Sequence, residues 1–449
     1  MLDWRFFWLK NIQNWLRIRV KSCRTGAPNK LVQTHVPYSG ILGNKITGGL
    51  ANELGDEFLL AKEVDMFGLS SFPKWLMGID HYFYHLLHNE MVAQASVGKQ
   101  YYQVELQGGA GKKGLLGSAV PTKSDIRVWN YNTVLCGGKG TLYWQFGPEL
   151  SGLESPGFGL FGFNGENTSR SLEASICAKE LNNSILDNAS RLCEENAIYV
   201  SRKVSLFCYA ADRLEEKYAK SLCGVYRAAY LNGIPIRYFH EDQISSLLES
   251  SIKNLYVPMP LVLDKKEQDI LFEFVNQGGN LILEAGAGLY DSNGEIDLNG
   301  STLKKLAHLE NKEIQRITED FPAETKVFSG KLYRQLINFV GNDVEPNYFF
   351  GDSEYAVTTT KIGKGKTTWI GSFISLGFEE NRDSLTEHFI INSFNQKGYN
   401  IIESLQITYY SPEKKGNNAV VIKLKEKNEA ILININPLDG KVKILSEEL

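Results

Sequence analysis

Short apolar runs alternate with amphipathic segments through residues 1–165, and each run ends in polar residues. The apolar runs, which predict buried strands, are residues 31–36, 64–70, 101–106 and 140–146. The amphipathic segments between them, which predict helices, are residues 56–62, 82–96 and 124–136. Strands that alternate with helices predict parallel βα units in an α/β fold. We count four units where a closed (β/α)8 barrel needs eight, and we interpret this part as half of such a barrel.

An aromatic stripe opens the chain. Trp4, Phe7, Trp8, Trp15 and Ile18 recur at spacings of 3, 4 and 7, which is typical of one helix face. We predict a helix whose aromatic face packs against another element. The stretch lacks a basic run followed by an apolar core, so it does not predict a signal peptide. We expect the chain to begin in the middle of a domain.

The alternation continues through residues 197–400 in a different pattern. The apolar runs that predict strands here are residues 203–209, 234–238, 254–260 and 280–284. With helices between them, these runs predict an open, doubly wound sheet of the flavodoxin or amidotransferase type. Residues 401–449 alternate strictly between apolar and polar, which predicts a small antiparallel β module. Residues 166–196 are interpreted as a connecting helical segment.

Composition excludes several function classes. The net charge of −4 over 449 residues shows no basic excess, so nucleic acid is not an expected partner. No run of about 18 apolar residues occurs, so no membrane span or membrane partner is expected, and we expect a cytoplasmic protein. The six cysteines form no CxxC pair and have no histidine at ligand spacing. We therefore expect no metal site, no cofactor and no disulfide framework.

Glu105 is the first candidate for chemistry. It follows the strand predicted to end at Val104 and precedes Gly108 and Gly109, which let a backbone approach a ligand closely. A carboxylate at the C-terminal end of a strand in a βα array indicates a functional group. A solvated or ion-paired surface glutamate is the alternative, and the local sequence favours neither.

The loop after residues 140–146 is the second candidate. Between Trp144 and Glu154 it combines an aromatic ring, an amide and two carboxylates, a mixture that sugar sites require. The alternative for Trp144 is an aromatic residue of the core. His35, at the end of its predicted strand, could bind a hydroxyl group, although a purely structural histidine is the simpler interpretation.

Several segments together resemble glycoside hydrolase family 42, β-galactosidases whose catalytic barrel is followed by a trimerisation domain and a small β domain. Residues 56–73 resemble the family's sixth barrel strand. Residues 103–109 resemble the seventh strand, which bears the nucleophile, and residues 142–154 resemble the eighth strand with its sugar-contacting loop. Residues 31–36 match the fifth strand. The resemblance therefore implies a partial barrel with strands 5–8 only.

The resemblance also implies residue roles. Glu105 would be the catalytic nucleophile, and Trp144, Glu154, Gln107 and His35 would bind substrate. The family's acid/base glutamate ends the fourth strand, and this chain starts after that strand, so no residue receives the role. Phe72 stands where the family usually has a tyrosine, which removes a hydroxyl group near the nucleophile.

The implied function is that of a retaining β-galactosidase that hydrolyses terminal β-D-galactosides, in a truncated form without its acid/base glutamate. The expected partners are a β-galactoside or related oligosaccharide and further copies of the chain, as a trimer by family resemblance. Two alternatives stay open. One is a non-catalytic carbohydrate-binding or assembly protein, and the other is the C-terminal half of a split hydrolase.

Overall fold

The computed structural model describes residues 1–43, 48–53, 55–182, 189–191, 195–232, 234–394, 418–424, 429–435 and 442–448. The chain divides into two compact units. Unit 1 comprises Met1–Phe6 and Cys193–Ile401, and unit 2 comprises Phe7–Leu192 and Ile402–Leu449.

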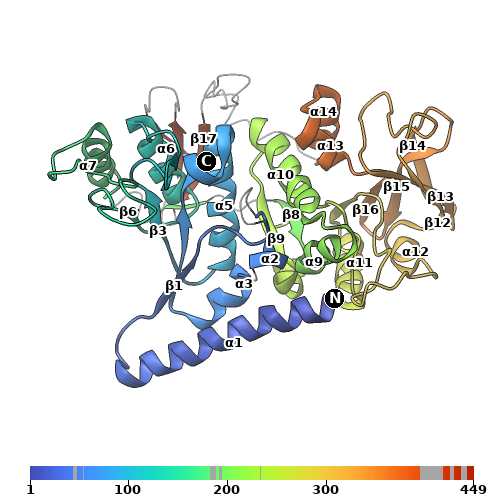
Figure 1. The fold of residues 1–449 in the computed structure, drawn as a ribbon. Helices are drawn as coiled ribbons and strands as arrows, with labels where there is room; N and C mark the ends of the chain where they lie inside the picture. Colours follow the sequence, from blue (N-terminus) through green and yellow to red (C-terminus); the bar gives the residue numbers. More distant parts are fainter. Residues whose placement is uncertain are drawn as a thin grey trace. The chain divides into compact units, whose positions relative to one another are not determined.

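Unit 2 contains a four-stranded parallel sheet in the order β1-β2-β3-β6 (Figure 1). Its strands are β1 (Gln33–Val36), β2 (Met66–Ser71), β3 (Gln100–Gln107) and β6 (Thr141–Trp144). Its helices are α1 (Leu2–Gly26), α2 (Leu50–Glu53), α3 (Glu57–Leu60), α4 (Pro73–Leu76), α5 (His81–Ala95), α6 (Lys123–Leu135) and α7 (Ser169–Leu181), of which α1 begins in unit 1. The four predicted strands and their parallel arrangement are confirmed, while the partial barrel stays a prediction.

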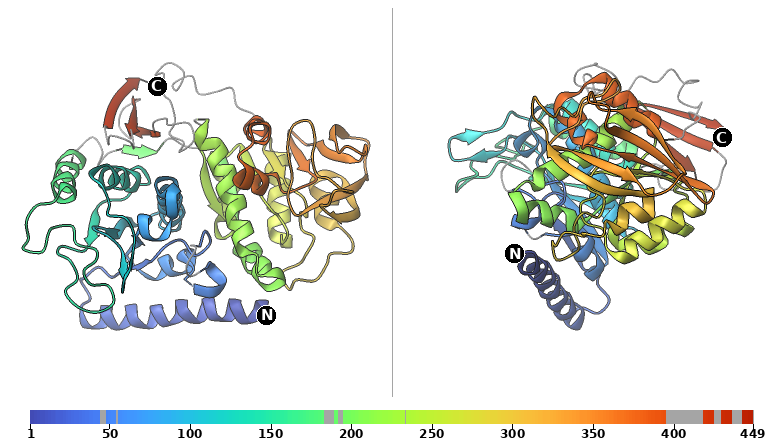
Figure 2. Two further views of the ribbon diagram at one scale, coloured as in Figure 1. Left: turned by 45° about the horizontal axis from the view of Figure 1, so that its top comes forward. Right: turned by 90° about the vertical axis from the view of Figure 1, so that its right-hand side faces the viewer.

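Helices α5 and α6 pack against each other, and the left view of Figure 2 shows them as neighbouring blue and teal helices. Leu106 of β3 joins Ile126 and Trp129 of α6 in one buried hydrophobic cluster, and Tyr143 of β6 packs against it. These contacts identify the face of the sheet that the helices cover. Successive residues of a strand point to opposite faces. The residues next to Leu106 in β3 and next to Tyr143 in β6 are therefore expected to point away from α6.

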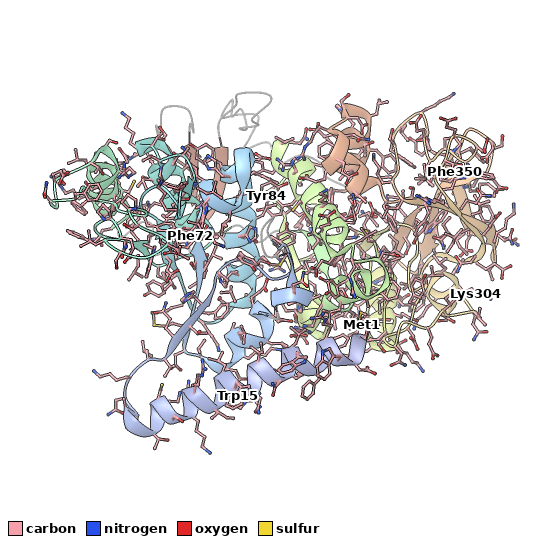
Figure 3. All side chains as sticks on the ribbon, in the orientation of Figure 1. Met1, Trp15, Phe72, Tyr84, Lys304 and Phe350 are labelled. Carbon is pink, nitrogen blue, oxygen red and sulfur yellow. The ribbon has the colours of Figure 1, made fainter. Side chains whose placement is uncertain are left out.

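The opening helix is confirmed, but its predicted packing face is wrong. In α1 the buried residues are Leu9, Gln13 and Val20. Trp15, labelled in Figure 3, is 58% exposed and Ile18 is 49% exposed. The face that packs in unit 2 carries the three buried residues, and Gln13 and Arg17 both donate to the Glu63 carboxylate.

Unit 1 contains a seven-stranded sheet in the order β14-β15-β16-β11-β10-β8-β9, parallel from β16 to β9. Its strands are β8 (Asn196–Val200), β9 (Arg237–His240), β10 (Asn254–Val257), β11 (Asn280–Leu283), β14 (Val344–Phe349), β15 (Tyr355–Ile362) and β16 (Gly365–Ile370). Beside this sheet lies the antiparallel pair β12 (Leu309–Arg316) and β13 (Tyr333–Phe339). The parallel α/β sheet predicted for this part of the chain is confirmed.

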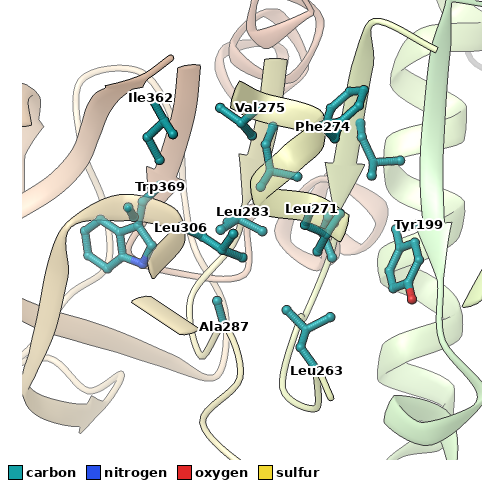
Figure 4. Close-up of a cluster of buried hydrophobic side chains, with 14 of the residues drawn as sticks. Tyr199, Leu263, Leu271, Phe274, Val275, Leu283, Ala287, Leu306, Ile362 and Trp369 are labelled. Atoms are coloured by element: carbon teal, nitrogen blue, oxygen red, sulfur yellow. The ribbon is translucent and has the colours of Figure 1, made fainter. Parts of the chain in front are cut away.

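The helices of unit 1 are α9 (Arg202–Asp212), α10 (Glu215–Leu231), α11 (Lys265–Asn276), α12 (Ser301–Ala307), α13 (Ile374–Asn381) and α14 (Ser384–Ser393). The core between strands and helices includes Tyr199, Leu271, Phe274, Leu283 and Trp369, all at most 5% exposed (Figure 4). Every residue of β8, β10 and β11 is buried, as expected for central parallel strands covered on both faces.

One strand predicted in this unit is wrong, because residues 203–209 belong to helix α9. Ser201 caps that helix: its hydroxyl group accepts a hydrogen bond from the backbone N–H of Val204. The strand is the preceding β8. A short apolar run is compatible with a buried strand or a buried helix, and only the cap separates the two cases.

The C-terminal strands β17 (Asn418–Leu424), β18 (Glu429–Ile435) and β19 (Val442–Glu448) pair antiparallel, as the strict alternation predicted. A fourth strand, β7 (Ala189–Arg191), pairs with β17. It comes from the segment that we interpreted as helical, and α7 is the helical part of that segment. The predicted domain boundary near residue 400 lies outside the described residues.

Candidate active site

Glu105 lies within β3, two residues before the strand ends at Gln107, whereas the sequence placed the strand end at Val104. Its side chain is half-buried. The hydroxyl group of Ser70, on the neighbouring strand β2, donates a hydrogen bond of 2.6 Å to Glu105 Oε2. Hydrogen bonds of this length from a hydroxyl group to a carboxylate are strong and directional.

A β-bulge in β3 sets the direction of Glu105. Along β2, Leu69 pairs with Gln103 and the next residue, Ser70, pairs with Glu105, so Val104 has no partner of its own. A bulge of this kind inserts one residue and shifts the alternation of side chains. As a result Gln103 and Glu105, which would share a face in a regular strand, point to opposite faces.

The contacts of Gln103 confirm that direction. Its side chain lies within hydrogen-bonding distance of His85 on α5 and donates to the backbone oxygens of Leu69 and Glu105. Gln103 therefore lies on the helix side and bridges the bulge. Leu106 also lies on the helix side, so Glu105 is on the face of the sheet opposite α5 and α6.

Trp144 ends β6 and pairs in register with Gln107 of β3. Tyr143 packs on the helix side, so Trp144 points to the same face as Glu105, and its side chain is 36% exposed. The structure therefore brings Trp144 and Glu105 to the same face at the same end of two adjacent strands.

Gln107 has a different environment, because its side chain is fully buried and fully engaged. Its carbonyl oxygen accepts from the backbone N–H of Lys74, and its amide group donates to Gly109 O and Ser118 Oγ. These bonds tie the loops after β2 and β3 together. Contact between Gln107 and a substrate stays a prediction.

Glu154 lies in the loop after β6 and is half-buried. Two backbone bonds join this loop to the loop after β3, from Gly114 N to Leu153 O and from Phe158 N to Ala110 O. His35, two strands away from β3, is exposed and pairs in register with Gly68 of β2. Roles for Glu154 and His35 in substrate binding stay predictions.

Arg170 at the start of α7 joins the loop after β3 to the loop after β6. Its guanidinium group donates to Gly108 O at 2.8 Å and to Gly159 O at 2.9 Å. Burial lowers the pKa of Arg170 from its ordinary value. The loop after Glu105 and the loop that carries Glu154 are therefore joined by one half-buried cation.

A charged cluster fixes the loop after β2, and no local sequence pattern predicts it. Lys74 Nζ lies 2.5 Å from Asp125 Oδ2 at the start of α6, and the Tyr82 hydroxyl group donates to Asp125 Oδ1. Burial opposes ionisation of Asp125, but the hydrogen bond from Lys74 leads the contacts that hold its pKa below the ordinary value. Burial lowers the pKa of the neighbouring His81 to about 4.

An aromatic cluster includes two residues that come after β2. The rings of Phe72, Trp75 and Phe158 lie 5.2–5.9 Å apart in edge-to-face arrangements. Phe72 therefore takes part in apolar packing. Within the part of the chain that the structure describes, no group of three metal-ligating side chains occurs, and no helix is long and apolar enough to cross a bilayer.

Comparisons with known proteins give relatives for both units. Residues 209–395 match the family described as the β-galactosidase trimerisation domain. The β-galactosidase LacZ of Heyndrickxia coagulans is 22% identical over 360 residues, which cover 76% of this chain and 51% of that protein. This chain therefore spans about half the length of that curated relative.

Solved structures are similar over the whole chain. A catalytic mutant of Gan42B, a family 42 β-galactosidase from G. stearothermophilus, matches 100% of this chain and 66% of its own chain, with a TM-score of 0.78 and 16% identity. An exo-β-1,4-mannosidase from an Opitutaceae bacterium matches 87% of this chain and 70% of its own, with a TM-score of 0.59 and 12% identity. The comparisons confirm the resemblance to glycoside hydrolase family 42.

Proposed function

We propose that the chain carries the nucleophile of a retaining glycosidase that acts on terminal β-D-galactosides, and that Glu105 is this nucleophile. The observation that carries the proposal is a half-buried carboxylate near the C-terminal end of a parallel strand, on the face opposite α5 and α6. The family 42 resemblance supports the reaction class. The β-galactosidase relatives support galactose as the sugar.

The proposed reaction has two displacement steps. A carboxylate oxygen of Glu105 forms a bond to the anomeric carbon, while the bond from that carbon to the leaving oxygen breaks with its electron pair. The leaving oxygen takes a proton from a carboxylic acid. Water then attacks the anomeric carbon of the glycosyl ester and releases Glu105. The proton of this water goes to the carboxylate that had served as the proton donor. Trp144 would lie against the sugar ring. Glu154 and His35 would form hydrogen bonds with the hydroxyl groups of the sugar.

The proton donor is the second requirement. Retaining enzymes hold their two carboxyl groups about 5–5.5 Å apart, and the resemblance matches none of the described carboxyl groups to the donor. We therefore propose that the acid comes from a polypeptide segment outside these 449 residues, as it would in a split hydrolase. Galactosides with poor leaving groups would then need that segment, whereas activated ones would not.

The test is covalent labelling with 2,4-dinitrophenyl 2-deoxy-2-fluoro-β-D-galactoside. Dinitrophenolate leaves without a proton, and the fluorine slows hydrolysis so that the glycosyl ester accumulates. We expect one added fluorogalactosyl mass, located on Glu105 by peptide mapping. Glu105→Gln should abolish the label. The control Glu166→Gln, at an exposed residue of the turn before α7, should keep it.

The outcomes separate the alternatives. A label on another carboxylate would assign the nucleophile elsewhere, and faster labelling by the corresponding mannoside would reassign the sugar. No label, together with galactoside binding in calorimetry, would favour the non-catalytic carbohydrate-binding function. We also propose a homotrimer, supported by the trimerisation-domain match, and expect three times the chain mass in light scattering.

A further inference from the structure

We propose that Ser70 is a positioning residue for Glu105 and orients the carboxylate for attack. This inference rests on the proposed function of Glu105 and adds how the attacking oxygen is chosen. Ser70 is 2% exposed, and its hydroxyl group donates to Glu105 Oε2 at 2.6 Å. Among the described residues this is the side-chain hydrogen bond to the Glu105 carboxylate, and it engages Oε2 rather than Oε1.

The bulge makes this contact possible. Ser70 and Glu105 are cross-strand partners because Val104 is skipped in the register. In a regular pairing, Val104 would lie opposite Ser70 and Glu105 would point toward the helices. The Gln103 amide bridges the bulge through Leu69 O and Glu105 O, so the register is fixed from the helix side. The hydroxyl group and the carboxylate are thus held together by the backbone of two strands.

Phe72, the first residue after β2, has no hydroxyl group that could donate to Glu105. Phe72 follows β2 and packs against Trp75 and Phe158, with ring centroids 5.9 and 5.2 Å away. A hydroxyl donor to a carboxylate lowers the rotational freedom of the carboxylate and is already in place before the substrate arrives, which is how a site is preorganised. In this chain that donor comes from Ser70 on the strand itself.

The strand also supplies a matched control. Ser71 is adjacent, fully buried and points to the helix side, and its hydroxyl oxygen has no hydrogen-bond partner among the residues that the structure describes. Ser71→Ala therefore removes the same atom from the same strand without touching Glu105. Ser70→Thr keeps a hydroxyl group on a residue that favours strands.

The test compares the kinetics of fluorogalactoside labelling in four proteins: the parent chain, Ser70→Ala, Ser70→Thr and Ser71→Ala. We expect Ser70→Ala to lower the maximal labelling rate about 10- to 100-fold, the range for a lost hydrogen bond to a charged group, with an unchanged half-saturating concentration. Ser70→Thr should recover most of the rate, and Ser71→Ala should match the parent. Thermal melts of each variant show whether the fold is kept.

The inference and the proposed function fail in different ways. If Ser70→Ala labels Glu105 as fast as the parent does, Ser70 has no positioning role and the nucleophile stands. If the parent is not labelled at Glu105, the proposed function fails. Crystal structures of the parent and Ser70→Ala then decide the positioning role alone, because an unchanged carboxylate orientation in the variant overturns it.

Discussion

Gly68 of β2 faces Val104 of β3 so closely that a Cβ atom on residue 68 would lie 2.1 Å from Val104 Cγ2 and 2.8 Å from the backbone oxygen of Tyr102. Val104 is the extra residue of the bulge. The absence of a side chain at residue 68 therefore provides the space into which the bulge folds. A side chain at residue 68 would therefore meet Val104, which precedes Glu105 in the bulge.

The first prediction concerns this space. Gly68→Ala should push Val104 out of place and lower the free energy of unfolding by about 1–3 kcal/mol, as overpacking does. It should also reduce labelling of Glu105, because a shifted register turns the carboxylate away from Ser70. Gly147→Ala is the control, since a Cβ there meets nothing within 4 Å. Equal stability of the two variants in denaturant titrations would contradict the role of Gly68.

Much of the sheet in unit 2 followed from sequence. Each predicted strand there was a short apolar run between helical patterns, and β3 was found with Glu105 near its end. The bulge was not predictable from hydrophobic alternation, since Val104 looks like any other strand residue. Gly68 was the available signal, because glycine inside a strand often marks a bulge or close approach.

Long-range polar contacts account for the other differences. Lys74 and Asp125 lie fifty-one positions apart in the chain and meet only after folding. The short apolar run of residues 203–209 predicts a strand, whereas the cap at Ser201 starts a helix there. The roles of Glu154 and His35 depend on a bound sugar and stay predictions.

The second prediction concerns α1, whose aromatic stripe suggested the wrong face. Leu9→Ala should lower the free energy of unfolding by about 2–5 kcal/mol, because Leu9 is 2% exposed and its loss leaves a cavity. Trp15→Ala should change it by about 0.5 kcal/mol or less, since the indole is 58% exposed. Denaturant unfolding of both variants measures the difference. A larger cost for Trp15 would show that the stripe is a packed face.

The third prediction concerns a buried ion pair in unit 1. Arg227 on α10 donates two hydrogen bonds to Glu379 on α13, at 2.9 and 3.0 Å, and both side chains are at most 5% exposed. Burial opposes ionisation of Glu379, but Arg227 and then Arg382 hold its pKa below the ordinary value. Glu379→Leu should cost about 3–5 kcal/mol, because it removes the carboxylate that pairs with the buried Arg227 charge.

Two comparisons test that reasoning. Arg227→Met should cost less than Glu379→Leu, since Arg382 still pairs with the carboxylate. Glu380→Gln, at the next residue of the same helix, should cost about 0–1 kcal/mol, because its lysine partners are more exposed. If all three variants unfold at the same denaturant concentration, the buried pair does not stabilise unit 1.

The last prediction concerns pH. Glu57 is fully buried, and burial, followed by the negative charge of Asp56, raises its pKa from 4.5 to about 7. The folded chain therefore keeps a proton that the unfolded chain releases. The stability contributed by this group is fully present below about pH 4.5 and is lost as the pH rises through about 7. Glu57→Gln has no such proton, so its melting temperature should fall less than that of the parent between about pH 5 and pH 8.

Glu63 supplies a control of opposite sign. The hydrogen bond from Arg17 leads the contacts that lower the pKa of Glu63, so its stabilising effect is present above pH 4.5 and is lost as the pH falls. Glu63→Gln should therefore be destabilised near neutral pH and match the parent in acid, whereas Glu57→Gln should gain on the parent as the pH rises. Melting curves of the three proteins across the same pH series distinguish these slopes. Parallel curves for Glu57→Gln and the parent would mean that Glu57 is not protonated in the folded chain, and that Ser39 and Gly40 bind it as a carboxylate through the hydrogen bonds they donate.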